Sequence, residues 1–105
     1  DYRAALGEFH RVLRPSGVLI ATYPFTDGAS TVVRAEVTGS GEIVHLLPPE
    51  YHGDPISGGV LCFYHFGWDI LDEVRAAGFS EAHMVMPWDP EGGVYFGNWT
   101  LIARR

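Results

Sequence analysis

The chain has 105 residues, of which 47% are hydrophobic and 19% charged, so we expect one globular domain over residues 1–105 rather than a disordered chain. The net charge of −6, the absence of lysine and the scatter of seven arginines exclude nucleic-acid binding through a basic face. No apolar run reaches the roughly 18 residues of a membrane span, and the sequence shows no signal-peptide pattern. The single cysteine, Cys62, cannot form an internal disulfide. Together these features predict a cytoplasmic protein.

The first predicted element is an amphipathic helix that ends at Pro15, because proline has no N–H and its ring clashes with the preceding turn. Its apolar residues recur at spacings of three and four: Tyr2, Ala5, Leu6, Phe9, Val12 and Leu13. The next segment, Gly17–Tyr23 (GVLIATY), is apolar at both alternating sets of positions. We therefore expect a strand buried on both faces, as in the middle of a parallel sheet with helices above and below.

The middle of the chain is predicted to form a hairpin followed by a long loop, an insertion over about residues 31–60. Two β-prone runs, Thr31–Val37 and Glu42–Leu47, flank the glycine-rich turn TGSG at 38–41. The segment PPEYHGDPISGG at 48–59 has three prolines and three glycines. It is predicted to be an irregular loop, and a loop of this length is often functional.

The last third of the chain predicts a short extended run over Leu61–Phe66, a helix over Trp68–Ala77 and two strands. Gly78 follows the helix at the position of a left-handed C-cap. The two strand candidates, Phe79–Met86 and Asn98–Ala103, are joined by a turn-rich segment without room for a crossover helix. We therefore expect them to pair antiparallel.

Three segments together resemble the C-terminal half of a class I S-adenosylmethionine (SAM)-dependent methyltransferase, of the methyltransferase-11-like type. EFHRVLRPSGVLIAT at 8–22 resembles the helix and fifth strand of that fold, with Ser16 where a glycine is usual. FGWDILDEVRAAGF at 66–79 resembles its next helix, and WTLIARR at 99–105 its seventh strand. LLPPEYHGDPI at 46–56 resembles a segment found in a subset of these enzymes.

The resemblance implies an α/β fold with a partial Rossmann-like sheet. Its elements would be a helix, the fifth strand, an inserted β-hairpin, a second helix and an antiparallel terminal strand pair, with the seventh strand between the fifth and the sixth. It also implies methyl transfer from SAM to a small-molecule acceptor, with this chain on the substrate side.

The family binds SAM through a glycine-rich turn after its first strand and an acidic residue after its second. The sequence has no G-x-G-x-G motif, and TGSG at 38–41 lies in a hairpin turn rather than between a strand and a helix. The cofactor-binding residues are therefore unknown. We expect a chain that has lost, or been cut from, its cofactor-binding half and is inactive without it.

Two aromatic residues are candidates for the substrate pocket. Ligands of open α/β sheets bind beyond the carboxyl ends of the parallel strands. Tyr23 and Phe25 lie at that end of the first predicted strand. The alternative is that both rings simply cap the core.

A polar cluster in the long loop supplies the candidate catalytic residue. His52 is the natural general base, because the ordinary pKa of histidine is near 6.5. Asp54 is a candidate to orient His52, and Tyr51 to hold the substrate. The alternative is a solvated loop with a turn at Asp54.

No metal site is predicted. The spacing of His45, His52 and His65 matches no standard zinc pattern. Cys62 is predicted to be a small buried hydrophobic side chain, and no acidic residue stands near it in the sequence to suggest a Cys–His pair. His65, three positions further on in a strand, is expected to point to the opposite face.

The alternative function is a non-catalytic module that binds itself or a partner. In the family's strand order, the strand at 17–23 lacks one neighbour and presents an unpaired apolar edge, which favours association. We therefore expect a homo-oligomer through that edge. A nucleic-acid or membrane partner is not expected.

Overall fold

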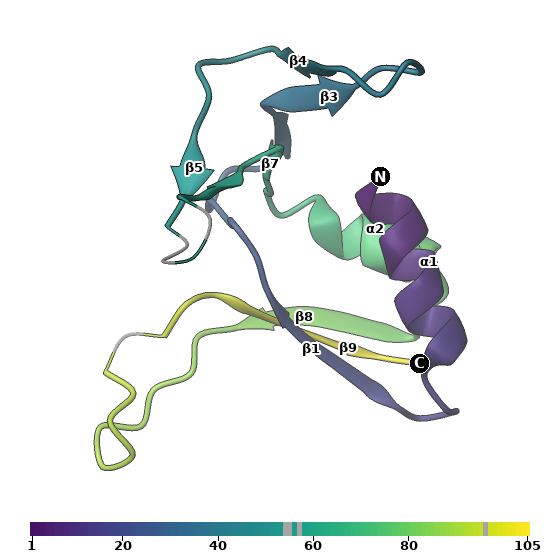
Figure 1. Cartoon of the computed structure of the whole chain (residues 1–105). Helices are drawn as coiled ribbons and strands as arrows, with labels where there is room; N and C mark the ends of the chain where they lie inside the picture. The colour runs from purple at the N-terminus through teal and green to yellow at the C-terminus, as the bar shows by residue number, and fades with distance from the viewer. Residues whose placement is uncertain (54–55, 57, 96) are drawn as a thin grey trace. The chain divides into compact units, whose positions relative to one another are not determined.

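The computed structural model describes residues 1–53, 56, 58–95 and 97–105 (Figure 1). The chain is mixed α/β, with two helices and small antiparallel sheets in its described part. It divides into two compact units, residues 1–23 with 69–105 (unit 1) and residues 24–68 (unit 2). The expectation of one domain over residues 1–105 stays a prediction.

Unit 1 contains both described helices. α1 spans Tyr2–Val12 and ends before Pro15, as predicted. α2 spans Ile70–Ala76 and begins two positions after Trp68, the predicted start. Neither described helix has the length and apolar character that a membrane crossing requires.

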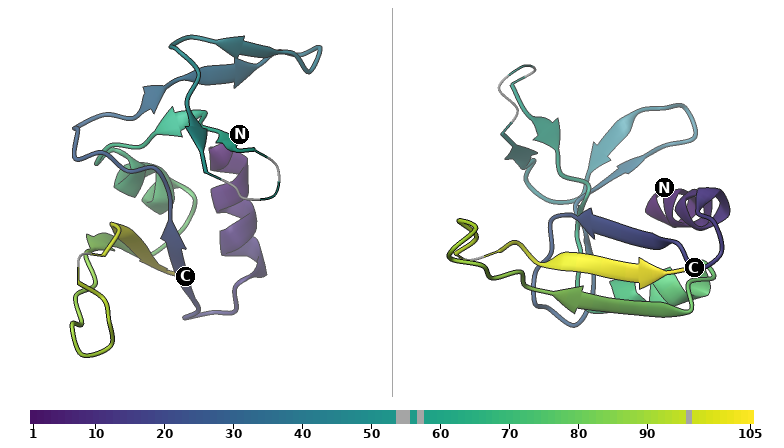
Figure 2. Two further views of the ribbon diagram at one scale, coloured as in Figure 1. Left: turned by 60° about the vertical axis from the view of Figure 1, so that its left-hand side comes forward. Right: turned by 90° about the horizontal axis from the view of Figure 1, so that it is seen from below.

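The sheet of unit 1 has three strands, which lie side by side in the right-hand view of Figure 2. β1 spans Val18–Thr22, β8 Glu81–Val85 and β9 Thr100–Arg104. β9 lies between β1 and β8 and is antiparallel to both. The predicted antiparallel pairing of the last two strands is therefore confirmed.

One face of this sheet is buried, whereas the other is buried at Thr100 and exposed at Ile20. Ala82, Leu101 and Ala103 are buried on the first face, and the α2 residues Ile70 and Val74 are buried as well. On the second face Ile20 is 67% exposed. The prediction that the strand at 17–23 is buried on both faces is therefore wrong. A strand with apolar residues at every position can be covered on both faces but need not be, and in this structure Ile20 of β1 stays exposed.

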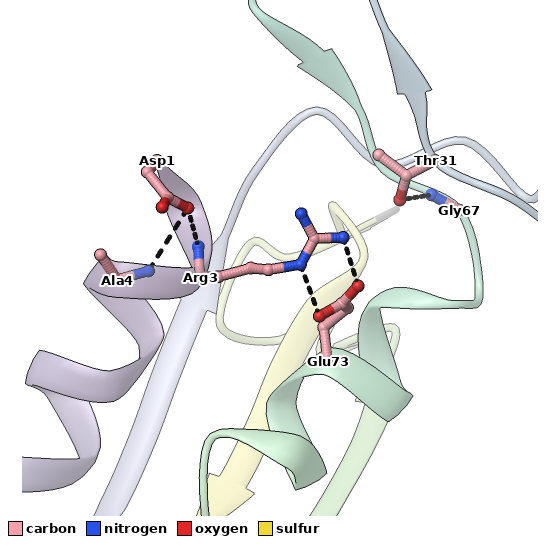
Figure 3. A network of polar contacts seen from close by, with 6 residues as sticks. All are labelled: Asp1, Arg3, Ala4, Thr31, Gly67 and Glu73. Carbon is pink, nitrogen blue, oxygen red and sulfur yellow. Dashed lines mark hydrogen bonds and ion pairs between the residues drawn. The ribbon is translucent and has the colours of Figure 1, made fainter.

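Polar contacts fix the start of α1 and join the two helices, as Figure 3 shows. The side chain of Asp1 accepts hydrogen bonds from the backbone N–H groups of Arg3 (3.0 Å) and Ala4 (3.5 Å). Such a cap satisfies donors that have no partner within the helix. The guanidinium of Arg3 also donates to the carboxylate of Glu73 in α2.

Gly78 ends α2 in the left-handed conformation that the sequence predicts, with φ of 109°. A Cβ atom at this position would lie 3.0 Å from the ring of His10. The His10 ring in turn meets Phe79 edge to face, with 5.3 Å between the centroids. Glycine is therefore required here for its backbone conformation and for the close approach of α1.

The described residues of unit 2 form three two-stranded antiparallel ladders. These pair β2 (Val32–Val33) with β7 (Tyr64–His65), β3 (Ala35–Val37) with β4 (Ile43–His45), and β5 (Tyr51–His52) with β6 (Val60–Leu61). The predicted hairpin around residues 38–41 is confirmed by β3 and β4. Thr31 Oγ1 accepts a hydrogen bond of 3.2 Å from Gly67 N–H within the same unit (Figure 3).

Two expectations for unit 2 are wrong. The segment 48–59 is not wholly irregular, because Tyr51–His52 forms β5. The run Leu61–Phe66 is not one extended segment, because its two ends belong to different ladders, β6 and β7. In both segments the structure is set by strand pairing with another segment of the chain. Local residue preferences do not predict such pairing.

Candidate functional site

The β5–β6 ladder places three polar side chains together. Tyr51 pairs with Leu61 and His52 with Val60, and Cys62 N–H donates to the carbonyl of Glu50 at 2.8 Å. Glu50 therefore stands opposite Cys62, and because side chains alternate along a strand, His52 shares the face of Glu50. The ligand-capable atoms of Glu50, His52 and Cys62 all lie within 4.8 Å of one another. We call these three residues the polar cluster.

Glu50 is held by two further side chains of unit 2. Its Oε1 atom lies 3.1 Å from Nε2 of His65, and its Oε2 atom lies 3.3 Å from Nη2 of Arg34. The hydrogen bond with His65 lowers the pKa of the Glu50 carboxyl below its ordinary value. Desolvation of the carboxyl opposes this shift of the pKa, and the electrostatic interactions of Glu50 with His65, Arg34 and His52 support it. Glu50 is therefore a carboxylate at neutral pH.

Cys62 is the buried member of the polar cluster, with 4% of its surface exposed. Its Sγ atom donates a hydrogen bond of 3.2 Å to the carbonyl of Tyr64. Burial raises the pKa of the Cys62 thiol, and the negative charge of Glu50 raises it further. By itself Cys62 is therefore a neutral thiol at neutral pH and not an activated nucleophile.

The expectation that Cys62 has no acidic neighbour is wrong, because the strand pairing brings Glu50 opposite it from twelve positions away in the sequence. His65 also contacts Glu50, since the chain leaves one ladder and enters another between Cys62 and Tyr64. Side chains alternate between faces only within one strand, and Cys62 and His65 do not belong to one strand.

Arg34 closes one side of the polar cluster. Its side chain is 15% exposed, and its Nη2 atom donates to the carbonyl of Pro48 at 2.8 Å as well as pairing with Glu50. Its Nε atom is buried and has no hydrogen-bond partner among the described residues. A guanidinium in this position balances the charge of the Glu50 carboxylate.

The predicted catalytic loop residues are only partly brought together. His52 belongs to the polar cluster and is exposed. Tyr51, also exposed, lies on the other face of β5 by alternation. Asp54 lies outside the described residues, so its proposed action on His52 stays a prediction. The sequence reasoning missed Glu50, although the i, i+2 spacing of Glu50 and His52 in a strand was the available signal.

The two aromatic candidates belong to different units. Phe25 lies in unit 2, where its ring meets Trp68 edge to face with 5.1 Å between the centroids. Tyr23 lies in unit 1, and its hydroxyl donates to Sδ of Met84 at 3.4 Å. Burial raises the pKa of Tyr23 to about 12, so its phenol is neutral at physiological pH. Their role in substrate binding stays a prediction.

Comparison of the chain with models of protein families, with curated proteins and with solved structures gave no match. The relation to methyltransferases therefore remains a proposal, and it rests on the sequence segments and on the arrangement of the strands.

Proposed function

We propose that this chain supplies the substrate-side part of a class I SAM-dependent methyltransferase that acts on a small-molecule acceptor. The observation that carries the proposal is the strand order β1-β9-β8, with β9 antiparallel to both neighbours. This is the order that the resemblance implies for the fifth, seventh and sixth strands of the family.

The positions of the helices support the same proposal. α1 leads directly into β1, and α2 leads directly into β8. The three segments that carry the resemblance coincide with α1 and β1, with α2, and with β9. On this proposal unit 1 is part of a Rossmann-like sheet, and unit 2 is the segment inserted after its fifth strand.

His52 is the proposed general base. In the reaction, a hydroxyl or amine of the acceptor attacks the methyl group of SAM, the thioether product leaves, and the proton of the acceptor passes to the imidazole. His52 is exposed, as a base that meets a substrate must be. The Glu50 carboxylate lies beside His52 in the polar cluster.

The proposal is tested on the complete product of the reading frame that encodes this chain. We expect the frame to encode a glycine-rich turn between a strand and a helix ahead of Asp1, and the product to bind SAM in calorimetry. Transfer from methyl-labelled SAM is then assayed with a panel of hydroxyl and amine acceptors. A frame without such a turn, together with no SAM binding by its product, contradicts the proposal.

The second candidate function is self-association through β1. In the described part of unit 1, β1 pairs with β9 along one edge only, and Val18 and Ile20 of β1 are exposed. A second copy that pairs with this edge would cover apolar surface and satisfy backbone groups. Sedimentation at micromolar concentration should then give a dimer for the chain and a monomer for Ile20→Glu. A monomeric parent chain would contradict this function.

A further inference from the structure

We propose that Glu50, His52 and Cys62 form a binding site for a divalent transition-metal ion, with Zn²⁺ as the best-matched ion. The polar cluster offers one carboxylate oxygen, one imidazole nitrogen and one sulfur within 4.8 Å of one another. These are the three ligand types that zinc binds in proteins, whereas magnesium and calcium prefer oxygen alone. This inference goes beyond the proposed methyl transfer and does not depend on it.

The spacing of the three atoms is close to what zinc requires. Bonds of about 2.0–2.2 Å to nitrogen or oxygen and about 2.3 Å to sulfur put tetrahedral ligands roughly 3.3–3.7 Å apart. The three atoms lie within 4.8 Å of one another, so each pair has at most about 1.5 Å to close when the ion binds. The backbone hydrogen bond of 2.8 Å from Cys62 N–H to the Glu50 carbonyl already holds the two segments in register.

The charges of the polar cluster also suit a divalent cation. Glu50 offers a carboxylate held by His65 and Arg34, and Cys62 offers a buried thiol. When the ion binds, the S–H bond breaks, the sulfur keeps the electron pair and bonds to the metal, and the proton leaves to water. The ion would then have two anionic ligands, the Glu50 carboxylate and the Cys62 thiolate, with the Arg34 guanidinium beside them.

Neighbouring side chains orient Glu50 as an outer shell. His65 and Arg34 each take one of its carboxylate oxygens, at 3.1 and 3.3 Å. A carboxylate has about four lone-pair positions, so an oxygen that accepts one hydrogen bond can still bind a metal. Ligating carboxylates in proteins are commonly held in this way.

The fold assembles a different set of ligands from the three histidines considered in the sequence. Of that set only His52 belongs to the polar cluster, while His65 contacts Glu50 from outside and His45 lies in β4. Three protein ligands leave a fourth position open, which is typical of zinc sites that hold water or a substrate. A metal on His52 also competes with its proposed role as a base.

The test titrates Co²⁺, as a visible substitute for Zn²⁺, into the metal-free chain with a phosphine reductant present. We expect one ion per chain and a thiolate-to-cobalt charge-transfer absorption, which only a bond to Cys62 can produce, because the chain has no other cysteine. Zn²⁺ should displace the cobalt. Calorimetry of Zn²⁺ in two buffers of different ionisation enthalpy should report proton release.

Variants separate this site from adventitious binding. Cys62→Ser should abolish the charge-transfer band, and His52→Ala should weaken binding by more than about 100-fold, beyond the roughly 10–100-fold loss that removal of an outer-shell partner causes. His45→Ala and Glu42→Gln, exposed residues of the β3–β4 hairpin, are the matched controls and should bind as the parent chain does. His52→Ala replaces an exposed side chain and tests the site even if Cys62→Ser does not fold. No charge-transfer band, or parent-like affinity in His52→Ala, overturns the proposal.

Discussion

The Nε atom of Arg3 lies 2.8 Å from the Oε2 atom of Glu73, so an ion pair joins α1 to α2 across 70 positions of sequence (Figure 3). The hydrogen bond from Arg3 lowers the pKa of the Glu73 carboxyl. A lowered pKa in the folded state means that folding favours the ionised form. The pair therefore stabilises the fold above the ordinary pKa of 4.5, and its contribution is lost as the pH falls through the lowered value.

Replacing Arg3 by glutamine should accordingly lower the melting temperature at pH 7 by a small, salt-sensitive amount, because both side chains are partly exposed. In strong acid Glu73 is protonated and the ion pair is lost. The parent chain and Arg3→Gln should then have the same melting temperature. Arg11→Gln is the control, since Arg11 pairs with Glu8 within α1 alone. An equal effect of Arg3→Gln at both pH values would show that the charge of Glu73 is not involved.

Two glycines should respond to alanine in opposite directions. Gly78→Ala should destabilise the chain by more than about 1 kcal/mol, because alanine resists φ of 109° and its Cβ would press on His10. Gly7→Ala should stabilise it by about 0.5–1 kcal/mol, because Gly7 lies inside α1 with nothing within 4 Å of the added Cβ. Urea unfolding followed by circular dichroism measures both changes. A destabilising Gly7→Ala would contradict the open environment assigned to it.

Tyr23 should make the fold sensitive to alkali. Burial raises the pKa of its phenol from 10.0 to about 12, so the folded state favours the neutral form. Its contribution is therefore complete below pH 10 and is lost as the pH rises toward 12. Tyr23→Phe should remove this part of the alkaline loss in melting temperature, while Tyr51→Phe, at an exposed phenol, should leave it unchanged. Identical alkaline profiles for the parent and Tyr23→Phe would be the contrary result.

The methyltransferase proposal makes a prediction for His52 in the complete enzyme. Loss of a general base costs roughly 10²–10⁴-fold in rate, so His52→Ala should lower kcat by that factor while SAM binding stays unchanged. His45→Ala, at another histidine of unit 2, should retain full activity. Full activity in His52→Ala would show that His52 is not the general base. It would not affect the proposal that the polar cluster binds a metal ion.

Much of the secondary structure could be predicted because its signals are local. Pro15 ends the first helix and Gly78 the second through their own backbone preferences. The glycine-rich turn at 38–41 and the short connection between the last strands leave antiparallel pairing as the only reasonable arrangement.

Pairing between distant segments and the covering of faces were decided only by the tertiary structure. The apolar pattern of β1 is the same whether one face or both are covered, so the exposure of Ile20 was not readable from it. Glu50 and Cys62 meet because β5 pairs with β6 in one register, and a slip of one residue would turn Cys62 to the other face. The amino-acid sequence by itself determined which residue types are present for acid–base or metal chemistry, and the strand register decided which of them stand together.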